Sequence, residues 1–181
     1  MKNVIFLSGL CVPKFIAKSK FVWNESLWDK YNTTFITSKI PVSDNMVASE
    51  LNRLSRIIKE FDNPIVAGHS LGAWWAANLA CLRSQLISKL VLLTPLSDTS
   101  CYPIFNVTPK FDPVNNAPYV FGPHKTLVIS SEYDLIVPAH NHANRISYHF
   151  GSQNYKLNGG HFYQTNHNQM ISYVQSWIDL P

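Results

Sequence analysis

The sequence has few charged residues and few cysteines, and these two features argue against a disordered chain and against a secreted disulfide-rich protein. Charged residues make up 14% of the 181 residues and hydrophobic ones 46%. This balance is typical of a globular chain and not of a disordered one. The three cysteines, Cys11, Cys81 and Cys101, are odd in number and form no CxxC pair. They argue against a secreted disulfide framework and for a reducing compartment, so we expect a cytoplasmic protein.

Long hydrophobic runs and dense blocks of one charge are also missing. No segment approaches the roughly 18 uninterrupted apolar residues of a membrane span. The net charge is +4, and the densest basic group is Lys14, Lys18 and Lys20. A nucleic-acid binder would show a denser basic stripe, so we expect no nucleic-acid partner. A solvated face is the default interpretation of the three lysines, and contact with an anionic substrate or carrier, such as an acyl carrier, is the alternative.

Strand-like and helix-like segments alternate along the chain. Apolar and β-branched runs predict strands at about 4–7, 33–37, 65–67, 89–94, 126–130 and 155–157. Apolar residues at three- and four-residue spacing predict helices at about 24–31, 45–61, 73–86, 139–148 and 169–178. Such alternation is typical of a mostly parallel sheet with helices on both faces. We therefore expect one α/β domain over residues 1–181, folded as a three-layer α/β/α sandwich.

A long segment between residues 96 and 123 shows no clear periodicity. It contains five prolines, at positions 103, 109, 113, 118 and 123. So long a loop is unusual in a compact domain and often covers a site. The sequence leaves open whether residues 97–123 close over a site or pack beside one.

The most informative motif is Gly68-His69-Ser70-Leu71-Gly72, which follows a predicted strand and precedes a predicted helix. This is the G-x-S-x-G pattern in its strand–turn–helix setting, where a tight turn lifts the serine hydroxyl clear of the sheet. Glycines on either side allow neighbouring backbone to pass close by. A glycine-rich turn with an incidental serine is the alternative. The motif makes Ser70 the candidate nucleophile.

A serine needs a base to take its proton, and that base needs an acid to orient it. Asp134 and His161 follow the last two predicted strands, where functional residues of open parallel sheets gather. The order serine, acid, histidine is that of the G-x-S-x-G hydrolases. Asp98 and Glu132 are rival acids. Asp134 could instead cap the helix predicted from about residue 139, and His161 could be an ordinary loop histidine.

Other histidines and aromatic residues have simpler interpretations. We expect His69 to be a packed turn residue with a local hydrogen bond, not a second base. A metal site at His140, His142 and His167 lacks ligand spacing, so a solvated surface is preferred for them. We expect Trp74 and Trp75 to pack the helix against the sheet, and one of them could also line an acyl pocket. Cys11 is more readily a small buried residue than a reactive thiol.

Three stretches together resemble the α/β-hydrolase superfamily. GHSLG is similar to its nucleophile elbow, TLVISSEYDLIVP to its acid-bearing segment and GGHF to its histidine loop. The short chain, without a cap domain, looks most like the small YdeN-like serine hydrolases. The resemblance implies hydrolysis of an ester, thioester or amide through an acyl-enzyme. It also implies that neither a metal nor an organic cofactor takes part.

The loop after the first strand departs from that pattern. Many members carry His-Gly there, whereas this chain has Leu7-Ser8-Gly9-Leu10-Cys11. An oxyanion hole needs two backbone N–H groups, one from Leu71 and one from this loop. We favour Leu10 as the second donor, with Gly9 and Cys11 as alternatives.

The sequence thus predicts a serine hydrolase acting on a small carboxylic ester or thioester through a triad of Ser70, His161 and Asp134. The alternative is a non-catalytic ligand- or partner-binding protein on the same fold, because fold alone does not fix function.

Overall fold

The computed structural model describes residues 1–9, 29–37, 39–100, 102–115, 124–163 and 165–181. Its centre is a parallel sheet with the strand order β2-β1-β3-β4-β5-β6. The strands are β1 (Asn3–Leu7), β2 (Asn32–Ile36), β3 (Ile65–His69), β4 (Lys89–Leu93), β5 (Thr126–Ser131) and β6 (Asn154–Leu157). The strand order reverses direction between β1 and β3. In open α/β sheets ligands bind beyond the carboxyl ends of the strands at such a switch point.

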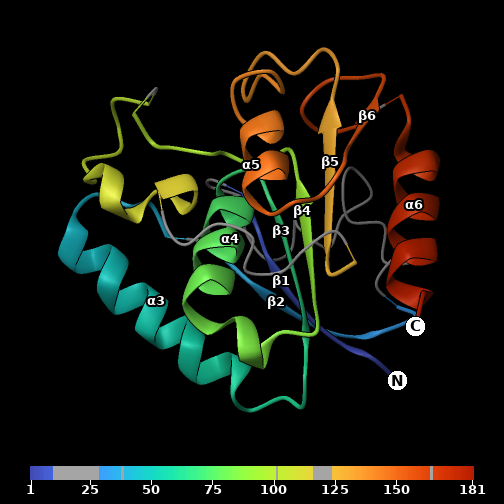
Figure 1. Cartoon of the computed structure of the whole chain (residues 1–181), viewed down its shortest axis with the longest axis horizontal. Helices are drawn as coiled ribbons and strands as arrows, with labels where there is room; N and C mark the ends of the chain where they lie inside the picture. The colour runs from blue at the N-terminus through green and yellow to red at the C-terminus, as the bar shows by residue number, and fades with distance from the viewer. Residues whose placement is uncertain (10–28, 38, 101, 116–123, 164) are drawn as a thin grey trace.

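Helices cover both faces of this sheet. α3 (Asp44–Ile58), α4 (Leu71–Arg83) and α5 (Ala143–His149) lie on one face, and α6 (His167–Asp179) lies on the other (Figure 1). Successive strand residues point to opposite faces. Ile5 and Leu7 therefore join the core under α3, α4 and α5, whereas Val4 and Phe6 join the core under α6. The predicted three-layer α/β/α architecture is confirmed.

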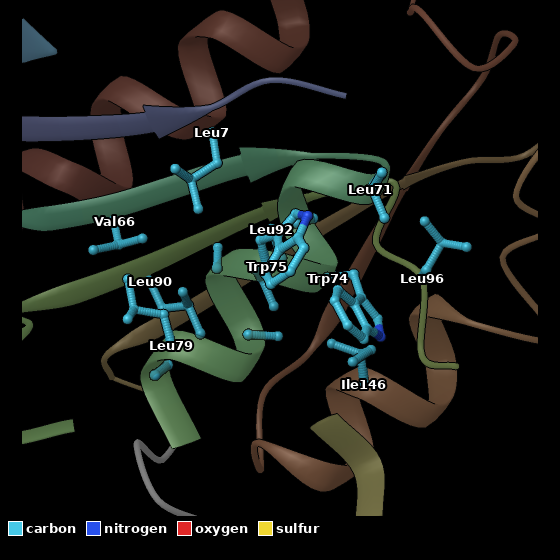
Figure 2. Close-up of a cluster of buried hydrophobic side chains, with 14 of the residues drawn as sticks. Leu7, Val66, Leu71, Trp74, Trp75, Leu79, Leu90, Leu92, Leu96 and Ile146 are labelled. Carbon is cyan, nitrogen blue, oxygen red and sulfur yellow. The ribbon is translucent and has the colours of Figure 1, made fainter. Parts of the chain in front are cut away.

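The central helix α4 is apolar on almost every side, because it lies between the sheet and other helices. Every residue from Leu71 to Ala80 is buried. Trp74 and Trp75 meet edge to face, with ring centroids 4.9 Å apart and an interplanar angle of 80°. Figure 2 shows both indoles inside the cluster that also contains Ile146 of α5. The predicted packing role of the two tryptophans is thus confirmed.

Several element boundaries differ from the predictions. α3 begins as expected, with the Ser43 hydroxyl accepting from the Met46 N–H, but it ends at Ile58 and not near residue 61. α5 begins at Ala143 and not near residue 139, because the carbonyl of Pro138 accepts from Asn141 and His142 in a turn. The helix predicted at about 24–31 lies mostly outside the described residues.

The described part of the segment that follows β4 has almost no regular structure. It contains two short 3₁₀ helices, η2 (Pro109–Phe111) and η3 (Pro113–Asn115). None of the described helices combines the length and the apolar character that a bilayer span requires.

Candidate active site

Ser70 occupies the single residue between the end of β3 and the start of α4. Its backbone has φ 56° and ψ −122°, a conformation that residues other than glycine rarely adopt. Such strain persists only where the surrounding structure enforces it, and it is common at active sites. Leu71 is the first residue of α4, so its N–H has no acceptor within the helix. The turn therefore presents a hydroxyl, followed by an N–H donor that has no acceptor within the helix, at the positive end of the helix dipole.

Gly68 and Gly72 make the tight turn sterically possible. A Cβ on Gly68 would lie 2.4 Å from the carbonyl oxygen of Gly72, and a Cβ on Gly72 would lie 2.0 Å from that of Leu7. Both contacts are with backbone, which cannot swing aside as a flexible side chain would. Any side chain at either position would push α4 away from β1 and β3.

Asp134 and His161 form a buried pair beyond the end of β5. The His161 Nδ1 lies 2.7 Å from the Asp134 Oδ2, and the two side chains are 6% and 0% exposed. The other oxygen, Oδ1, accepts from the backbone N–H groups of Ile136 and Val137 at 2.8 and 2.7 Å. Because a carboxylate only accepts, Nδ1 carries the hydrogen and Nε2 is left as the acceptor. This is the tautomer that a general base needs.

The histidine loop is attached to the end of β5, which carries the acid. The Gly159 carbonyl accepts from the Ser131 hydroxyl at 2.7 Å and from the Tyr133 N–H at 3.0 Å. Gly159 has φ 131°, a conformation that a residue with a side chain rarely adopts. These two bonds join the loops before Asp134 and before His161, so the carboxylate and the imidazole are held as one unit.

Ser70 and His161 line the same cavity, whose volume is about 230 Å³. The remaining lining residues are mostly apolar: Gly9, His69, Leu71, Leu96, Tyr102, Ile104, Phe105, Ile136, Val137 and Phe162. Leu96 and Val137 are buried, while Ile104 and Ile136 are about half exposed. The cavity therefore has an apolar floor and an apolar mouth, and the described lining contains no lysine, arginine or carboxylate.

The rival carboxylates have other partners. Asp98 is buried and accepts from the Ser97 and Ser100 hydroxyls at 3.0 and 2.6 Å and from the Arg145 Nη1 at 2.5 Å. Burial alone would raise the pKa of Asp98, but the hydrogen bonds from the two serines, together with the charge of Arg145, hold it below its ordinary value. Glu132 is exposed at the end of β5. Of the three candidate acids, the structure brings Asp134 to His161.

Two expectations about histidines need correction. His142 is buried and not solvated, and its Nδ1 lies 3.1 Å from the Ser97 hydroxyl. His69 is packed as expected, but the hydrogen bond seen for it is not local, because its Nε2 lies 3.0 Å from the carbonyl oxygen of His161. His140 is exposed, as expected. Within the residues that the structure describes, no three His, Cys, Asp or Glu side chains are arranged to hold a metal ion.

Several sequence-based candidates cannot be placed. Leu10, Cys11 and the group Lys14, Lys18 and Lys20 lie outside the described residues. The nearest described part of that loop is Gly9, where a Cβ would lie 3.3 Å from the Ser70 Cβ. The loop after β1 thus begins directly beside the serine.

The cavity wall was not predicted from the sequence. Tyr102, Ile104 and Phe105 come from the irregular segment after β4, and they form one side of the cavity. Tyr102 is fixed there by its hydroxyl, which donates to the Ile136 carbonyl at 2.5 Å. Trp74 and Trp75, in contrast, are outside the described lining, and the Trp74 Nε1 donates to Asp112. The sequence feature that could have predicted this wall is the presence of aromatic residues in a loop without periodicity.

Comparisons with known proteins identify the family and the fold. Residues 10–177 match the family model described as serine hydrolase. A comparison with curated proteins gave no match.

Similar solved structures share the fold at low sequence identity. MGS-MChE2, an α/β hydrolase from the metagenome of sediments of the Mar Chica lagoon, has a TM-score of 0.70 at 15% identity, covering 98% of this chain and 90% of that one. A monoacylglycerol lipase from Paleococcus ferrophilus has a TM-score of 0.67 at 14% identity, covering 97% of this chain and 94% of the lipase. The thioesterase domain from the curacin biosynthetic pathway has a TM-score of 0.65 at 12% identity, covering 96% of this chain and 91% of that domain. The chain therefore belongs to the serine hydrolase family and has the α/β-hydrolase fold.

Proposed function

We propose that the protein hydrolyses a small carboxylic ester or thioester with an apolar acyl group, using Ser70, His161 and Asp134 as a catalytic triad. The observation that carries this proposal is the buried Asp134–His161 pair at the wall of the cavity that Ser70 also lines. A strained serine and a histidine paired with a carboxylate thus line one mostly apolar cavity, and this supports the proposal.

The proposed reaction starts when Ser70 Oγ attacks the acyl carbonyl carbon and His161 Nε2 takes the hydroxyl proton. Asp134 holds the imidazole in position and stabilises the positive charge that forms on it. The Leu71 N–H, with a second N–H from the loop after β1, receives the negative carbonyl oxygen. The His161 proton then passes to the departing alcohol or thiol. A water molecule, deprotonated by His161, releases the acid and restores Ser70.

The cavity supports an uncharged acyl group as the substrate. A charged acyl chain would lose its hydration among Leu96, Phe105 and Val137, and the described lining residues offer it no ion partner. Linear or branched alkyl groups instead gain about 0.8 kcal/mol for each methylene that they bury. The alcohol or thiol side of the substrate is less restricted, and an acyl carrier remains a candidate for it.

Turnover of short p-nitrophenyl esters and acyl thioesters by the wild type and by Ser70→Ala tests the proposal. We expect the variant to lose about 10⁴-fold or more in kcat, because removal of any triad member has that order of effect. Labelling by a fluorophosphonate should vanish in parallel. Equal turnover by both proteins would refute the proposal. A wild type that binds esters but neither cleaves them nor becomes labelled would favour a non-catalytic binding protein.

A further inference from the structure

His69 is a buried histidine that the proposed chemistry does not use. It is the last residue of β3 and immediately precedes Ser70. Its side chain is 1% exposed, yet it lines the cavity and contacts His161, with ring centroids 4.7 Å apart and an interplanar angle of 54°. A second imidazole thus lies directly against the proposed base.

The hydrogen bond of His69 fixes which of its nitrogens carries the proton. Nε2 lies 3.0 Å from the carbonyl oxygen of His161, and a carbonyl oxygen only accepts, so Nε2 is the donor. Burial, and then the neighbouring His161, lower the pKa of His69 to about 3. The ring is therefore neutral at working pH, and its Nδ1 carries no hydrogen.

The other edge of the ring faces the loop after β1. A Cβ on Gly9 would lie 3.2 Å from the His69 Nδ1, so this edge meets the start of the loop that the proposed oxyanion hole needs. His69 therefore contacts both loops that must be correctly placed relative to Ser70. A side chain with one donor and one compact ring is suited to holding such a spacing.

We propose that His69 is a positioning residue, whose neutral imidazole donates from Nε2 to the His161 carbonyl and holds the His161 ring at the distance from Ser70 that proton transfer requires. This inference rests on the proposed function. A neutral ring suits the role, since His161 becomes an imidazolium during the reaction and a cationic neighbour would oppose that charge. Among the described residues, His161 is the titratable group that faces His69.

The matched variants His69→Gln and His69→Met test the role. The two unbranched side chains reach equally far, out to the ε position, but only glutamine has an N–H donor there. A displacement of about 1 Å can reduce a rate by roughly 100-fold. We therefore expect methionine to lower kcat about 100-fold with KM changed less than about twofold, and glutamine to restore kcat to within about tenfold of the wild type.

His149→Met provides a matched control. His149 is a buried histidine of α5 that lies outside the described cavity lining. This variant should lower the thermal midpoint while leaving kcat unchanged. Equal kcat values for the glutamine and methionine variants of His69, either both near the wild type or both strongly reduced, would overturn the proposed role.

Imidazole nitrogen NMR of the wild type, recorded as a function of pH, tests the inference without activity measurements and without substitutions. We expect His69 in the Nε2–H tautomer with no titration above about pH 4. Titration near pH 6 to 7, or an Nδ1–H tautomer, would overturn the proposal. The two proposals can fail separately. A wild type without Ser70-dependent turnover would refute the proposed function, whereas the NMR spectrum of His69 reports its tautomer and titration whether or not the protein is active.

Discussion

The ends of β4 and β5 lie side by side in the sheet, and each is followed by a buried aspartate. Asp134, after β5, is bonded to two backbone N–H groups and to His161. Asp98, after β4, is bonded to serine hydroxyls and to the cationic Arg145. The partner decides what each carboxylate can do. A permanent cation neutralises Asp98 and holds the segment after β4, whereas an imidazole with a second nitrogen available can pass on a proton.

The largest expected effect tests whether Asp134, and not Asp98, is the acid that orients His161. Asp134→Asn should lower kcat about 10⁴-fold, because an amide N–H toward His161 Nδ1 favours the tautomer whose Nε2 cannot accept the serine proton. Steady-state kinetics on a short ester would measure it. If Asp98→Asn produced that loss and Asp134→Asn did not, the assignment of the acid would be wrong.

Asp98→Asn should instead change stability. The asparagine retains the oxygen that accepts from Ser100, but it loses the hydrogen bond from Ser97 and the ion pair with Arg145, which both use Oδ2. The Arg145 side chain is 52% exposed, so water partly screens this ion pair. We expect a loss of about 1 to 2 kcal/mol in the free energy of unfolding. Urea unfolding would measure the loss, and kcat should change by less than about threefold. A neutral effect on stability would show that the ion pair adds nothing to folding.

Phe105→Ala tests whether the segment after β4 affects function by shaping the cavity. Phe105 lines the cavity and carries no chemistry, so its removal should leave the fluorophosphonate reaction of Ser70 intact. The widened wall should lower kcat/KM about tenfold for the preferred acyl chain and shift the preference toward longer chains. A series of p-nitrophenyl esters of increasing chain length measures both effects. An unchanged chain-length profile would mean that this wall does not contact the acyl group.

The smallest expected effect concerns Asp112, which binds the same segment to α4. Its Oδ1 accepts from the Trp74 Nε1 at 3.2 Å and from the Thr99 N–H at 3.0 Å. Burial, with a contribution from Asp98, raises the pKa of Asp112 to about 6. The folded state therefore binds a proton that the unfolded chain releases, and the stability this contributes is complete below about pH 4 and is lost as the pH rises through about 6.

Asp112→Asn retains Oδ1 as an acceptor and removes this titration. We expect the variant to match the wild type near pH 4 and to exceed its free energy of unfolding by about 1 kcal/mol near pH 8. Thermal or urea unfolding at both pH values measures the difference. If the wild type instead became more stable relative to the variant between pH 4 and 8, the folded protein would stabilise the Asp112 carboxylate, and its pKa would not be raised.

The strands and the serine turn could be predicted because their causes are local. β-branched runs such as Val4–Leu7 need only short-range sterics to be extended, and the spacing of Gly68 and Gly72 around Ser70 encodes a turn that other residues cannot form. The interpretation of His142 as solvated was wrong for the opposite reason. The buried His142 ring lies against Ser97, which is 45 residues away in the sequence.

The sequence by itself determined the α/β architecture and the order of serine, aspartate and histidine along the chain, because periodicity and glycine sterics act over a few residues. Only the tertiary structure decided that Asp134 and not Asp98 meets His161, that Tyr102 and Phe105 form the cavity wall, and that His69 bonds to the histidine loop. Each of these is a contact between distant segments, and which segments meet depends on how the helices pack against the sheet, which no local pattern specifies.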